Sequence, residues 1–75
     1  MYSLDLHGLS HTMAKEEVEE TLLSASALGS FDMVVITGNS EAMKNIVIDI
    51  CSENDFDYYV PSDNLGTVVV SYTNL

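Results

Sequence analysis

Residues 33–40, MVVITGNS, decide the fold, because an apolar run there gives way to a polar turn. A continuous apolar run such as that of residues 33–37 is typical of a strand whose two faces are both covered. Gly38, Asn39 and Ser40 then interrupt the run, and Glu41 opens a segment whose apolar residues recur at helical spacing. The stretch therefore predicts a buried strand, a tight loop and a helix in succession.

Outward from this stretch, periodicity and the positions of the glycines predict the other elements. Strands are expected at residues 2–7, 33–37, 56–60 and 67–72, helices at 11–28 and 41–54, and a hairpin connection at 61–66. The first helix should bury Ala14, Val18, Leu22, Ala25 and Leu28, and the second Met43, Ile46, Val47, Ile50 and Cys51.

The order of these elements is βαβαββ, which predicts a single α/β domain spanning residues 1–75. Each strand–helix–strand passage favours a parallel pair with a right-handed crossover, whereas the final hairpin must be antiparallel. We therefore expect a mixed four-stranded sheet with both helices on one of its faces.

Composition limits the class of protein. The 75-residue chain has 12 acidic residues against two lysines and no arginine, a formal net charge of −10, so it lacks the basic footprint of most nucleic-acid-binding proteins. The same charge disfavours an anionic membrane surface. With one cysteine, we expect neither an intrachain disulfide nor a zinc site of the usual four-ligand kind. With no signal-like or membrane-spanning run, we expect a cytoplasmic protein without a membrane partner.

Two loops are expected to lie together at the carboxyl ends of the first two strands. They are residues 7–10, HGLS, and residues 37–40, TGNS. Ligands bind preferentially at this edge of α/β sheets, and each loop leads into a helix whose free N–H groups suit a phosphate. The candidate phosphate-binding residues are Gly8, Thr37, Gly38, Asn39 and Ser40.

Asp5 and His7 are the candidate catalytic residues, since side chains two apart on a strand share a face. The Asp5 carboxylate could hold a divalent cation, Mg²⁺ or Mn²⁺, while His7 acts as general acid or base on a phosphodiester. Alternatively Asp5 orients the imidazole, or His7 only ties the two strand ends together by a hydrogen bond. Ser40 is expected to be a helix N-cap rather than a nucleophile.

Three segments together resemble the Smr (small MutS-related) domain family. Residues 4–10, LDLHGLS, resemble its LDxH and DLHG opening, residues 37–40 stand where the family carries HGxG or TGxG, and residues 66–70, GTVVV, resemble its closing strand. The resemblance covers essentially the whole chain. It implies a fold similar to the C-terminal domain of translation initiation factor three, and DNA or RNA binding, often with endonuclease activity. By the same resemblance, Asp5 and His7 match the residues tied to cleavage.

The chain departs from the family pattern at three points. Ser40 replaces the second glycine of the second motif, Thr37 replaces the commoner histidine, and the usual excess of Lys and Arg is absent. Two hypotheses follow from the acidic surface. The chain is a Smr-like, metal-assisted endonuclease whose acidity is diffuse, or it is a non-catalytic acidic module that mimics nucleic acid or binds a basic protein partner.

Overall fold

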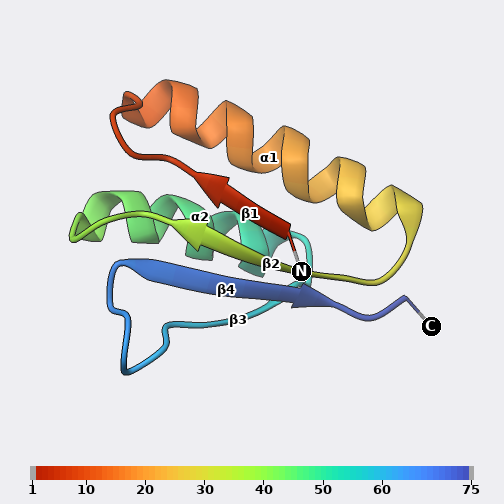
Figure 1. Ribbon diagram of the computed structural model, residues 1–75. Helices are drawn as coiled ribbons and strands as arrows, with labels where there is room; N and C mark the ends of the chain where they lie inside the picture. The colour runs from red at the N-terminus through yellow and green to blue at the C-terminus, as the bar shows by residue number, and fades with distance from the viewer. Residues whose placement is uncertain (1, 75) are drawn as a thin grey trace.

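The computed structural model describes residues 2–74, and Met1 and Leu75, the ends of the predicted domain, lie outside the described residues. The elements follow the predicted βαβαββ order (Figure 1). They are β1 (Tyr2–Asp5), α1 (His11–Leu28), β2 (Phe31–Ile36), α2 (Glu41–Glu53), β3 (Asp57–Tyr59) and β4 (Thr67–Tyr72). The α/β class and the mixed four-stranded sheet are therefore confirmed.

The strands lie in the order β1-β2-β4-β3. β1 and β2 pair in parallel, and β4 is antiparallel to both β2 and β3. The expected parallel pair between β2 and β3 is wrong, because β4 lies between them. Burial explains this order: the first four residues of β4 are buried, as suits a strand with two neighbours, whereas all three residues of β3 are exposed, as suits an edge.

Both helices cover one face of the sheet, and α2 lies behind the strands in Figure 1. Along β2 the residues Phe31, Met33 and Val35 are buried, while the alternating Asp32 and Ile36 are exposed. Because successive strand residues point to opposite faces, only the first set faces the helices. The prediction that both faces of this strand are covered is therefore wrong, and the second face of the sheet is open.

The core forms between the helices and the covered face of the sheet. Its buried residues include Ala14, Val18 and Leu22 from α1, and Met43, Val47, Ile50 and Cys51 from α2. The rings of Phe31, Phe56 and Tyr72 close one part of it, with centroids 5.4–6.0 Å apart. Leu28, expected in this core, is instead 89% exposed at the last residue of α1. Within residues 2–74, neither helix has the length and apolar character that crossing a bilayer needs.

Because Cys51 is buried, the stability of the fold is expected to fall at alkaline pH. Burial raises the pKa of this thiol from its ordinary value of 9.0 to about 11. Between these two pH values the unfolded chain releases the thiol proton and the folded chain retains it, so stability falls as pH rises. Two pKa units correspond to a loss of about 2–3 kcal/mol.

The measurement is urea unfolding of the wild type and Cys51→Ala at pH 8 and pH 11. The two proteins share every other side chain, so the difference between their losses of stability isolates the thiol. The wild type should lose more stability than the variant. Equal losses would show that ionisation of Cys51 is not the cause.

Candidate functional site

The two candidate loops leave the same edge of the sheet. In the parallel pair β1–β2, Asp5 lies opposite Ile36, the last residue of β2. The pairing continues one step further, since the Leu6 N–H donates to the Ile36 carbonyl at 3.0 Å. Residues 7–10 and 37–40 therefore start side by side, at the N-terminal ends of α1 and α2, as predicted from the element order.

Asp5 positions His7 through the backbone. β1 ends at Asp5, and His7 lies in a turn beyond it, so strand alternation does not place the two side chains. The Asp5 Oδ1 atom accepts the backbone N–H of His7 at 2.8 Å. Gly8, at φ +82°, completes the turn in a conformation that L-residues with a Cβ adopt only at a cost. The exposed imidazole of His7 thus sits on a short turn held by the preceding carboxylate.

Thr37 and Gly38 tie the second loop to the β3–β4 connection. Their two N–H groups donate to the Gly66 carbonyl at 2.8 and 2.9 Å. The buried Thr37 hydroxyl lies 3.2 Å from the same oxygen and 3.1 Å from the Gly38 carbonyl. These N–H groups already have an acceptor, so Thr37 and Gly38 shape the loop, which leaves Asn39 and Ser40 as its candidates for contact with a phosphate.

Serines cap both helices at this edge. Ser10 Oγ accepts the Met13 N–H at 3.2 Å, and Ser40 Oγ accepts the Met43 N–H at 3.1 Å. The expected N-cap at Ser40 is confirmed, and the geometry selects Ser10 at the start of α1. Each hydroxyl satisfies one of the four N–H groups that a helix leaves unpaired at its first turn. The positive ends of two helix dipoles therefore lie at one edge of the sheet.

The basic side chains of the chain belong to the two segments that contain the loops and the starts of the helices. Residues 5–15 and 37–44 contain both lysines and both histidines, but only two of the 12 acidic residues, Asp5 and Glu41. With neutral histidines these two segments carry no net charge, and the other ten acidic residues account for the −10 of the chain. The buried Lys44 places its Nζ atom 3.7 Å from Glu41 Oε1.

Sequence reasoning did not note that His11, Lys15 and Lys44 lie close in the chain to the two loops. The signal was present, since each lies within one or two turns of the start of a helix that follows a candidate loop.

The described residues do not form a protein metal centre. Within residues 2–74, no three or more His, Cys, Asp or Glu side chains gather in a way that could hold an ion. Asp5 is the one carboxylate among the candidate residues, and its Oδ1 atom already accepts the His7 N–H. Although Mg²⁺ can bind through one carboxylate together with substrate phosphates, no preformed set of ligands supports the expected cation here.

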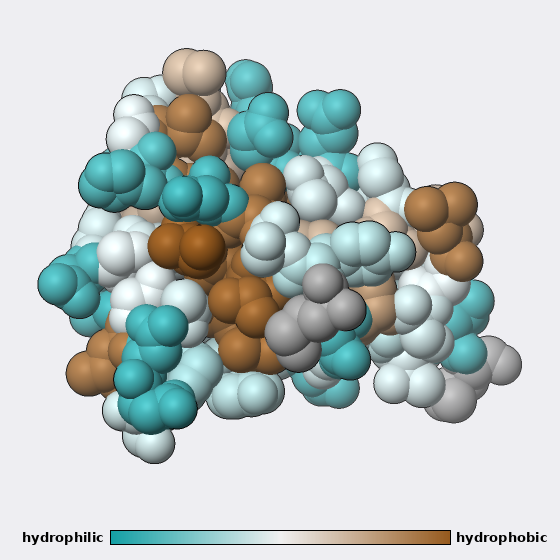
Figure 2. Space-filling model, in the orientation of Figure 1, coloured by the Kyte–Doolittle hydropathy of each residue, from teal (hydrophilic) through white to brown (hydrophobic). Residues whose placement is uncertain are grey.

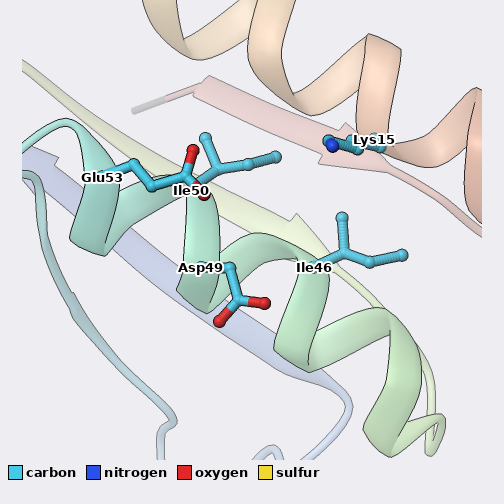
Figure 3. A pocket seen from close by; sticks show the side chains of 5 residues that line it. All are labelled: Lys15, Ile46, Asp49, Ile50 and Glu53. Atoms are coloured by element: carbon cyan, nitrogen blue, oxygen red, sulfur yellow. The ribbon is translucent and has the colours of Figure 1, made fainter.

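A hollow between the helices lies apart from this edge. Figure 3 shows Lys15 from α1 and four side chains from α2 around it: Ile46, Asp49, Ile50 and Glu53. None of the candidate catalytic or phosphate-binding residues lines it. The Nζ atom of Lys15 lies 4.0 Å from Glu19 Oε1 on the same helix. The candidate site is therefore the exposed edge formed by the two loops rather than this hollow.

Comparison with known proteins does not assign a function to this chain, so the assignment depends on the geometry of the site. No protein-family model, curated protein or solved structure matches this chain.

Proposed function

We propose that this chain is a Smr-like nucleic-acid-processing domain that binds a phosphodiester at the edge formed by residues 5–10 and 37–40. The observation that carries the proposal is the distribution of charge. The edge and the starts of the two helices that leave it, residues 5–15 and 37–44, hold all four basic side chains and two acidic ones, whereas ten of the 12 acidic residues belong to the rest of the chain. His7 is the basic side chain within the edge itself. A phosphate approaching the edge meets two helix N-termini, and residues 5–15 and 37–44 around it carry no net charge.

His7 would carry the chemistry at this edge. Its imidazole is exposed on a turn beside the second loop, where it can take a proton from an attacking hydroxyl or give one to a leaving oxygen. Asp5 holds the turn in place through the His7 N–H. Asn39, exposed in the adjoining loop, and Ser40 would contact the phosphate oxygens. The LDxH-like and TGxG-like segments support the same assignment through their resemblance to the Smr family.

The test is cleavage of supercoiled plasmid DNA and of structured RNA by the wild-type chain, with Mg²⁺ or Mn²⁺ and separately with EDTA. We expect nicking or cutting of at least one substrate. Cleavage that persists in EDTA would assign the chemistry to the protein side chains alone. Cleavage lost in EDTA would assign a cation that binds together with the substrate. No cleavage under either condition would contradict the proposal.

Salt gives this assay a second expected result. The Debye length is about 30 Å at 0.01 M salt and about 8 Å at 0.15 M. At low salt the whole charge of −10 repels the substrate, whereas at 0.15 M the substrate responds mainly to residues 5–15 and 37–44, which carry no net charge. The cleavage rate should therefore rise between these two salt concentrations. A steady fall would indicate ordinary binding to a basic surface, which this chain does not have.

A further inference from the structure

The open face of the sheet, opposite the helices, has an ordered pattern of side chains. Strand register places Val34 opposite Val69 and Val69 opposite Tyr59, which gives one apolar row across β2, β4 and β3. In the next row Asp32 and Asp57 lie on either side of Ser71. Paired residues of neighbouring strands share a face, so both rows belong to the open face.

Much of this face is accessible in the part of the chain that the structure describes. Tyr59 is 60% exposed, both aspartates are exposed and Val34 is partly exposed, whereas Val69, between Val34 and Tyr59 in the middle of the row, is only 8% exposed. Figure 2 shows hydrophobic side chains gathered over the strands near the centre of the view. Apolar side chains that are grouped on one open face, rather than scattered singly, indicate a surface for binding another molecule.

Charge indicates what kind of molecule this is. The open face carries Asp32 on β2 and Asp57 on β3, and the four strands carry no lysine, arginine or histidine. The open face is therefore acidic without a counter-charge of its own, and the net charge of −10 opposes a second copy of the chain. A basic partner is the complementary one.

The spacing of the two aspartates on the open face indicates the shape of that partner. Asp32 and Asp57 lie two strands apart, and strands are about 4.8 Å apart, so their Cα atoms are separated by roughly 10 Å. This separation is close to the diameter of an α-helix, about 10–12 Å with its side chains. A helix lying along β4 would place its apolar stripe on Val69 and a basic side chain on each flank over one aspartate.

We propose that the open face binds a basic amphipathic helix of a partner protein, with Val34, Val69 and Tyr59 receiving its apolar stripe and Asp32 and Asp57 its lysines or arginines. The surface shares none of these residues with the proposed cleavage site. The two proposals can therefore fail independently.

The probe is an 18-residue helical peptide of leucine and lysine, with leucines at positions i, i+3, i+4 and i+7, and calorimetry in 0.15 M NaCl gives its Kd. A scrambled peptide of the same composition controls for attraction between opposite charges. We expect the helical peptide alone to bind tightly and to shift the backbone amide resonances of Val34, Tyr59 and Val69. Resonance shifts confined to α1 and α2, equal binding of both peptides, or no binding would overturn the proposal.

Two charge-matched variants locate the contact. Asp32→Asn/Asp57→Asn removes two charges from the open face, and Glu17→Gln/Glu20→Gln removes two from the exposed side of α1. The first pair should weaken binding of the helical peptide about 10-fold, because each lysine loses its partner, and the second less than about 2-fold. Equal weakening by both pairs would show that the peptide responds only to net charge.

Discussion

Replacing His7 with alanine is expected to lower the rate of phosphodiester cleavage by about 10²–10⁴-fold, the range that a general acid or base contributes. His7 lies two residues beyond the end of β1, on the turn beside residues 37–40, and its side chain is exposed. Its removal leaves no buried contact unfilled, so the variant should fold as the wild type does. Initial rates on plasmid DNA and structured RNA, together with circular dichroism, measure both expectations.

His11 provides the matched control for this variant. It is also exposed, and it directly follows the loop of residues 7–10 as the first residue of α1. His11→Ala makes the same change in size and in histidine count, so it should retain at least about half of the wild-type rate if only His7 transfers a proton. An equal loss in both variants would indicate that histidines act here only through general attraction for phosphate. Equal cleavage by His7→Ala and the wild type would indicate a contaminating nuclease.

Two variants of Asp5 distinguish two roles of its carboxylate in the same cleavage assay. The carboxylate either holds the turn or supplies a negative charge. Asp5→Asn keeps a side-chain oxygen that can accept the His7 N–H, but it removes the charge. Asp5→Ala removes both. If Asp5 only holds the turn, as the 2.8 Å hydrogen bond to the His7 N–H indicates, Asp5→Asn should stay close to the wild-type rate and Asp5→Ala should not. If both variants lose activity equally, the negative charge itself is required.

The sequence predicted the order and type of all six elements because each has a local signature. The buried stripe of α1, the apolar run of β2 and the serines before both helices are all readable within a few residues. Strand order needs a comparison between segments. The valine-rich β4 fits a central position better than the three exposed residues of β3, and that difference was already present in the two sequences.

Coverage of the sheet could not be predicted from the apolar run of residues 33–37. Val34 and Ile36 lie on the open face of β2, where neighbouring strands flank them but no layer covers them. An apolar strand with one open face reads like a fully buried one, because hydropathy does not state what lies above a side chain.

The candidate site shows the same limit of local reasoning. That the two loops meet follows from topology, but the pairing of the Thr37 and Gly38 N–H groups does not. Their acceptor, the Gly66 carbonyl, lies 29 residues beyond Thr37. No pattern within the TGNS segment encodes that contact, so the sequence alone presents all four of its residues as free to bind a phosphate.

Two leucines of α1, one buried and one exposed, give the second large expected effect. Leu22 is 0% exposed in the core and Leu28 is 89% exposed at the end of α1, although helical spacing placed both in one buried stripe. Leu22→Ala removes buried methyl groups and leaves a cavity, which costs about 2–5 kcal/mol. A domain of this length has a total stability of about 4–11 kcal/mol, so the variant should lose a large part of it.

For a domain of this size each kcal/mol lowers Tm by about 4–8 °C, so Leu22→Ala should melt at least about 8 °C below the wild type. Leu28→Ala deletes the same atoms from the same helix, but water already surrounds them, so its Tm should change by no more than about 3 °C. Thermal unfolding followed by circular dichroism compares the two directly. Similar losses in both variants would mean that Leu28 is packed in solution. The core would then extend to the end of α1, as the periodicity of the helix predicted.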